Sequence, residues 1–292
     1  MASELISAKI DVVFKKLFVD NRDLLEDFVA SMLDIPNESI KKISVTNSEL
    51  TPEDISAKFS RLDLNLVVED KLVNVEMQVN KEPDYADRTL YYWAKLYTSE
   101  LKSGEEYSEL KKTIAINIID FDMFEGKNYH TEVAAMIKGT DKVFSDKFSI
   151  HFFELRKVSE KPQTRREQWL QFINADSKEE FEMVKATGTP KIQKAVKVIL
   201  DMSEDTRVRE MVRMREKTLH DEASALKHAK DEGRAEGRAE AISEATEIFT
   251  ANLRAMGMSE AQIQMALGLS PAQPMGNYIS AEAHDDDYTP EP

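Results

Sequence analysis

Two alternating runs between residues 61 and 79 constrain the fold of this chain more than any other feature. Asp63 and Glu76 lie in these runs, in which apolar residues occupy every second position. This period of two predicts two half-buried strands that form a hairpin. If Glu69 and Asp70 form a two-residue turn, Asp63 lies directly opposite Glu76, with their Cβ atoms about 5 Å apart. The inward positions are Leu62, Leu64, Leu66, Val73, Val75, Met77 and Val79.

The other face of this hairpin is polar and acidic. Asp63, Glu76 and Gln78 share it. Two carboxylates held side by side destabilise each other unless a cation lies between them. Oxygen ligands favour a hard cation such as Mg²⁺. The alternative interpretation is an ordinary solvent-facing surface of a sheet.

The composition narrows the function classes. The 292 residues include no cysteine, which excludes disulfides, thiolate zinc sites and a cysteine nucleophile and is typical of a reducing cytoplasm. The N-terminal residues lack the pattern of a signal peptide, and no apolar run is long enough to span a membrane. The net charge of −15 argues against a broadly basic nucleic-acid surface, but a local basic cleft or a metal ion can supply positive charge.

The remaining patterns predict an α/β core with a mixed sheet, followed by helices. Helical periodicity covers residues 9–34 and 84–103, and a β-branched run at 113–119 predicts a strand buried on both faces. Further elements are expected as strands at 40–50, 130–137 and 147–155 and as helices at 164–174, 178–186, 190–202, 204–256 and 259–267. Residues 273–292 predict a disordered acidic tail.

The C-terminal helices leave two questions open. A Glu-Gly-Arg-Ala repeat at 232–240 places Gly233 and Gly237 on one stripe of the long helix. This stripe indicates either a solvated, flexible helix or a surface for self-association or a partner, and a homodimer is our working expectation. The last helical pair, at 244–272, is either a DNA-binding helix-turn-helix or an interaction element.

Charged residues on two helices supplement the hairpin. Asp11 and Lys15 lie one turn apart on the first helix. Arg88, Tyr91, Tyr92 and Lys95 follow at i, i+3, i+4 and i+7, the spacing of one helix face. The five histidines form no close pair typical of a metal site, and the segment around His151 and Glu154 predicts a structural sheet edge.

In this order the motifs resemble the PD-(D/E)XK nuclease superfamily, and within it the recombination-promoting nuclease (Rpn-like) family. The resemblance covers residues 8–270. The similar segments are Asp11-Val-Val-Phe-Lys-Lys-Leu-Phe, Leu62-Asp63-Leu, Val75-Glu76-Met-Gln78, Tyr91-Tyr-Trp-Ala-Lys95-Leu-Tyr97 and His151-Phe-Phe-Glu154-Leu-Arg-Lys157.

The resemblance implies a restriction-endonuclease-like core at 1–160, a helical extension at 161–203, and a long polar helix with a terminal helical pair at 204–272. It implies a metal-dependent DNA endonuclease, a hydrolase linked to recombination or transposition, with Mg²⁺ as cofactor and Mn²⁺ as a substitute. Asp63 and Glu76 would bind the metal. Asp11 matches an acidic residue of the first core helix, and the alternative for Asp11 is a solvated first-turn acid.

Gln78 stands where the superfamily usually carries a lysine, although glutamine is the pattern in this subfamily. A neutral amide can orient a water molecule but supplies no charge to the phosphate. Lys95 or Lys15 could supply it from a neighbouring helix, and we favour Lys95; the alternative is that Lys95 only covers the aromatic stripe. The rival function is a catalytically weak or inactive DNA- or protein-binding module that uses its C-terminal helices.

Overall fold

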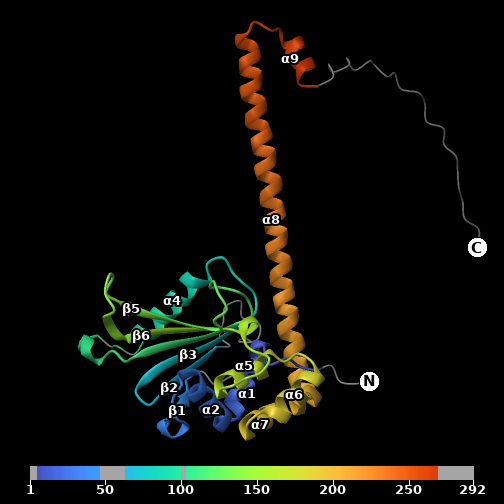
Figure 1. Ribbon diagram of the computed structural model, residues 1–292. Coiled ribbons are helices and arrows are strands. Elements are labelled where there is room, and N and C mark those ends of the chain that lie inside the picture. Colours follow the sequence, from blue (N-terminus) through green and yellow to red (C-terminus); the bar gives the residue numbers. More distant parts are fainter. Residues whose placement is uncertain (1–4, 47–62, 100, 102, 269–292) are drawn as a thin grey trace, which may run out of the picture. The chain divides into compact units, whose positions relative to one another are not determined.

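The computed structural model describes residues 5–46, 63–99, 101 and 103–268 (Figure 1). The chain divides into two compact units, Met1–Glu222 and Ala223–Pro292. The predicted acidic tail at 273–292 and the first two residues of the predicted hairpin, Arg61 and Leu62, lie outside the described residues.

A six-stranded mixed sheet forms the centre of the first unit, as the sequence predicted. The strand order is β1-β2-β3-β4-β6-β5. Strands β3, β4 and β6 run parallel to one another, whereas β1 pairs antiparallel with β2, β2 with β3, and β5 with β6. The bounds are β1 Ile43–Val45, β2 Leu64–Val68, β3 Lys71–Gln78, β4 Thr113–Ile119, β5 His130–Met136 and β6 Val143–Glu154.

The β2–β3 hairpin has the turn and register expected from its alternation. Val68 pairs with Lys71, which leaves Glu69 and Asp70 as the two-residue turn. Glu69 takes a left-handed conformation with φ of 56°. Such a conformation is usual in tight hairpin turns. One part of the prediction is wrong: β3 ends at Gln78, and Val79 is 42% exposed rather than directed inward.

Helices cover both faces of the sheet, with the larger core on one side. Helices α1 (Asp11–Asp20), α2 (Arg22–Leu33), α5 (Arg165–Asn174) and α7 (Pro190–Glu204) lie on one face, and α4 (Tyr85–Thr98) on the other (Figure 1). All seven residues of β4 are buried, which confirms the strand predicted to be covered on both faces. The aromatic side chains in the larger core include Phe14, Phe18, Phe28 and Trp169.

Helix α4 and strand β6 have boundaries that differ from the predicted ones by four or five residues. Helix α4 ends at Thr98 rather than near residue 103, because the N–H and hydroxyl of Ser99 both donate to the Leu96 carbonyl and close the last turn. Strand β6 begins at Val143 rather than 147, because its exposed first residues continue to pair with β5 across a bulge. Because these exposed residues show no alternation of apolar and polar positions, the sequence did not predict that the strand begins at Val143.

The remaining helices follow the predicted order. They are α6 (Lys178–Thr187), α8 (Thr206–Ala255), α9 (Glu260–Ala266) and the short 3-10 helices η1 (Asn37–Ser39), η2 (Tyr107–Glu109) and η3 (Leu155–Lys157). Helix α8 begins in the first unit and continues into the second. Within the second unit, Ile263 of α9 is buried, and Arg254 pairs with Glu260. Among the described residues no helix is both long and apolar enough to cross a membrane.

Candidate active site

Glu76 is a buried carboxylate in the middle of the sheet. It lies on β3, pairs in register with Asn117 of β4, and is 4% exposed because α4 covers this face. Leu64 pairs with Val75, so continuing the antiparallel register by one residue sets Asp63 across from Glu76. Asp63 itself is half-buried and directly precedes β2. The hairpin therefore brings the two predicted metal ligands to one face of the sheet.

Arg88 of α4 reaches this face of the sheet and makes several hydrogen bonds there. Its Nη2 donates to Glu76 Oε1 and to Gln78 Oε1, each at 2.8 Å. Its Nη1 donates to Glu82 Oε2 at 2.5 Å, and the guanidinium carbon lies 5.1 Å from the centre of the Tyr85 ring. One guanidinium group therefore joins two strand residues, the following loop and its own helix.

The electrostatics of the site reflect a buried charge with one strong partner. Burial raises the pKa of Glu76, Arg88 opposes this rise, and Glu82 adds to it, so that the pKa stays above its ordinary value. The Tyr85 hydroxyl likewise has a raised pKa, through burial and then the negative charge of Glu76. A carboxylate whose charged form is disfavoured gains most from an additional cation.

Gln78 is held in one orientation by its neighbours. Its Nε2 donates to the backbone carbonyl of Asn80 at 2.9 Å and faces Glu82 Oε1 at 3.4 Å. Its Oε1 is then directed at Arg88. The amide thus accepts from a cation on one side and donates to the loop on the other.

The other predicted site residues lie in different surroundings. Asp11 accepts two hydrogen bonds from Arg215 on its Oδ2, at 2.8 Å from Nε and 2.7 Å from Nη2, and its Oδ1 accepts from the N–H of Val12. Lys15 is 1% exposed on α1. Tyr91 and Lys95 are exposed, whereas Arg88 is turned toward the sheet, so the predicted common face of α4 is only partly directed at the site.

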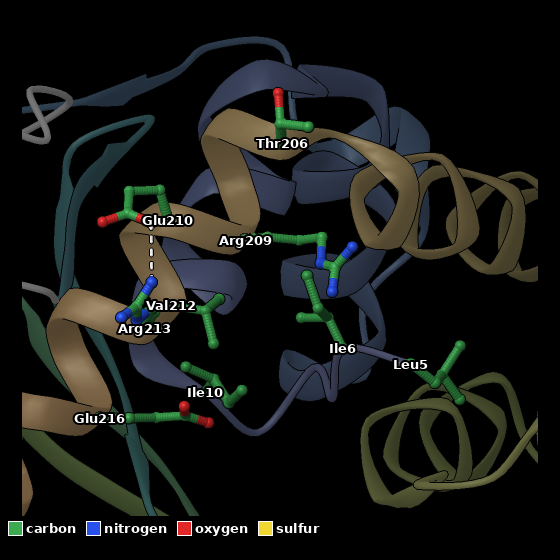
Figure 2. A pocket seen from close by; sticks show the side chains of 9 residues that line it. All are labelled: Leu5, Ile6, Ile10, Thr206, Arg209, Glu210, Val212, Arg213 and Glu216. Carbon is green, nitrogen blue, oxygen red and sulfur yellow. Dashed lines mark ion pairs between the residues drawn. The ribbon is translucent and has the colours of Figure 1, made fainter. Parts of the chain in front are cut away.

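The described residues contain no group of three or more histidine, aspartate or glutamate side chains arranged to hold a metal ion. Asp63 and Glu76 are a pair, and Asp11 is engaged by Arg215. A cavity of about 420 Å³ lies between residues 5–10 and the start of α8 (Figure 2). The residues that line the cavity include Arg209, Glu210, Arg213 and Glu216. None of the predicted site residues lines it.

Arg88 lies on the helix where it was predicted, but its contacts to Glu76, Gln78 and Glu82 were not predicted. The absence of a lysine at position 78 was the sequence signal for these contacts. A site that lacks a cation at one position needs a cation from another element. Glu82 was missed altogether, since its role depends on the loop between β3 and α4.

Comparison with known proteins gives one match. A family model described as PD-(D/E)XK nuclease family transposase matches residues 8–229, which is well over half of the chain. No curated protein and no solved structure matches the chain. The matched segment includes the β2–β3 hairpin, α4 and the first part of α8.

Proposed function

Because this chain belongs to the PD-(D/E)XK nuclease family of transposases, we propose that it is an endonuclease that hydrolyses DNA phosphodiester bonds with a divalent metal ion. The observation that carries this proposal is the buried Glu76, set across the hairpin from Asp63 on a rigid sheet. Burying a carboxylate is costly, and a metal site gives a reason to retain it. Recombination or transposition is the proposed setting.

The donor atoms fit a hard divalent cation. Asp63 and Glu76 would hold the ion through carboxylate oxygens, together with the backbone carbonyl of Met77, and such ligands suit Mg²⁺ or Mn²⁺. When bound, the ion lowers the pKa of a coordinated water and screens the phosphate charge. Asp11, the third predicted ligand, can take part only if its contacts to Arg215 are released.

The other side chains would orient the reactants. Gln78 is proposed to position the attacking water or the group that does so, since its amide lies beside Glu76 through their shared contact with Arg88. Lys95, the cation favoured from the sequence, lies at an exposed position on α4 and is the alternative source of positive charge for the phosphate. Positioned charges of this kind stabilise the transition state because they need no rearrangement during the reaction.

The proposed substrate, DNA, has to approach a chain whose net charge is −15. The metal ion and Arg88 would offset this repulsion at the site, and strong dependence on salt is expected because phosphate contacts release counterions. The lack of cysteine supports a reducing, cytoplasmic setting for the protein.

We also propose that two copies associate through the second part of α8. This segment exposes apolar side chains, with Ile242 at 58%, Ile248 at 57% and Phe249 at 47%. Helices with such surfaces commonly pair. Light scattering of the full chain and of a chain ending near residue 203 tests this, and an unchanged oligomer number after truncation would count against helix-driven assembly.

The rival function is a DNA- or protein-binding module without activity. Plasmid nicking with purified protein and Mg²⁺ separates the two. Asp63→Ala and Glu76→Ala should each lower cleavage by about 10²-fold or more, whereas Asp70→Ala, which removes an exposed carboxylate from the turn of the same hairpin, should retain it. Cleavage that survives both site variants would refute the assignment, and no cleavage with any divalent metal would favour the rival.

A further inference from the structure

We propose that Arg88 is the positioned cation of this site and that Gln78 is the residue that holds it there. The proposal rests on the proposed function and deepens it. It assigns to α4 the charge that a lysine on β3 would otherwise supply, and it assigns that charge to Arg88 instead of Lys95.

The guanidinium group of Arg88 lies where it contacts both strand residues. A single nitrogen, Nη2, lies 2.8 Å from Glu76 Oε1 and 2.8 Å from Gln78 Oε1. Residues 76 and 78 point to the same face of β3 because strand side chains alternate. A lysine at position 78 would bring its ammonium group toward Glu76 on this face. Arg88 reaches the same carboxylate from the helix above the sheet.

Gln78 and Arg88 are also chemically matched. The Gln78 amide donates to Asn80 and accepts from Arg88. A carbonyl oxygen attracts the guanidinium group, whereas an ammonium group at the same position would repel it. Glutamine at position 78 is therefore the residue that an arginine at position 88 requires, rather than a defect in the motif.

Arg88 also has hydrogen-bonding capacity that its contacts leave unused. Its Nε is buried and has no hydrogen-bond partner among the described residues. Its Nη1 is held by Glu82, whose side chain is 42% exposed and can exchange this contact for water. The Tyr85 ring supports the guanidinium plane. Once released from Glu82, Nη1 can donate to a phosphate oxygen while Nη2 stays on Glu76 and Gln78.

Mn²⁺ titration calorimetry of the full chain tests this role independently of cleavage. Removing the charge with Arg88→Gln should tighten Mn²⁺ binding at least about fourfold, because a positive charge about 5 Å away opposes metal binding even with the dielectric of water. The same variant should lower the cleavage rate by about 10²-fold or more. A residue that only supports the fold would lower both the affinity and the rate.

Two exchanges at position 78 complete the series. Gln78→Lys alone should weaken Mn²⁺ binding, since it adds a second cation next to Glu76. Combining Gln78→Lys with Arg88→Gln should return the affinity toward that of the unmodified protein and raise cleavage about tenfold or more above that of Arg88→Gln. Arg88→Lys should fall between the unmodified protein and Arg88→Gln in cleavage. Arg22→Gln, which removes an exposed arginine of α2, is the control for a change in net charge.

The results separate this proposal from the proposed function. If the unmodified protein cleaves DNA but Arg88→Gln leaves the Mn²⁺ affinity unchanged or weakens it, Arg88 is not the positioned cation. If Lys95→Gln reduces cleavage as strongly as Arg88→Gln while the position-78 exchange restores nothing, Lys95 holds that role. If the unmodified protein binds no Mn²⁺, the metal site and the role of Arg88 both fail. If it binds Mn²⁺ with the predicted series but cleaves no DNA, only the proposed activity fails.

Discussion

The ion pair between Asp11 and Arg215 offers a quantitative test, because it joins residues 204 positions apart in the chain. Asp11 Oδ2 accepts two hydrogen bonds, at 2.8 and 2.7 Å, while the Arg215 and Asp11 side chains are 9% and 25% exposed. Breaking a fully buried pair costs about 3–5 kcal/mol, and an exposed pair contributes about 0–1 kcal/mol. For this partly exposed pair we expect Asp11→Asn and Arg215→Gln each to lower the free energy of unfolding by about 2–3 kcal/mol.

A double-mutant cycle measured by urea denaturation tests this expectation. The double variant should cost less than the sum of the single variants, with a coupling energy of about 1–2 kcal/mol. The reasoning fails if the two losses simply add to within about 0.5 kcal/mol. Mn²⁺ affinity adds a second result: Asp11→Asn should change it by less than about threefold if Arg215 keeps the carboxylate occupied. A larger loss would establish Asp11 as the third metal ligand.

Three further predictions concern titratable groups that are buried or half-buried. Glu154 is fully buried and accepts from Lys157 and from the N–H groups of Met123 and Phe124, so Glu154→Ala should lower the free energy of unfolding by about 3–5 kcal/mol in urea titrations; a loss below about 1 kcal/mol would contradict the contacts. The pKa of Glu76 is raised, so above pH 4.5 the metal-free folded state binds more protons than the unfolded chain. Stability should therefore fall as the pH rises from 4.5, and Glu76→Gln should flatten that fall. Burial, with Arg166 second, lowers the pKa of His130 to about 4, so thermal stability should fall as pH drops from 6.5 toward 4; an equal fall in His130→Gln would count against this cause.

The elements of this fold could be predicted where burial follows a regular period. Strand β4 matches its predicted residues from Thr113 to Ile119, because a strand covered on both faces needs an unbroken apolar run. The Glu69-Asp70 turn was confirmed because the alternation on both sides of it allows only one register. The same register explains why the sequence could predict that Asp63 lies across from Glu76.

The orientation of α4 could not be predicted in the same way. Its aromatic residues lie around the whole helix, so the pattern did not show which side packs on the sheet. Tyr85 and Thr89 are buried, whereas Tyr91 and Lys95 are exposed. Arg88 and Lys95 share a helix face but lie about 10 Å apart along the helix axis, so the placement of α4 along the sheet decides which cation reaches Glu76. Long-range contacts such as that between Asp11 and Arg215 leave no local signal at all.

The central claim is that Asp63 and Glu76 share one metal ion. Crystals soaked with Mn²⁺ and measured at the manganese absorption edge test it most directly. We predict one anomalous peak at about 2.1 Å from an oxygen of each carboxylate, with Arg88 still near Glu76, and no such peak in crystals of Glu76→Gln. A peak that contacts neither carboxylate, or no peak in crystals of a protein that cleaves DNA, would contradict the claim.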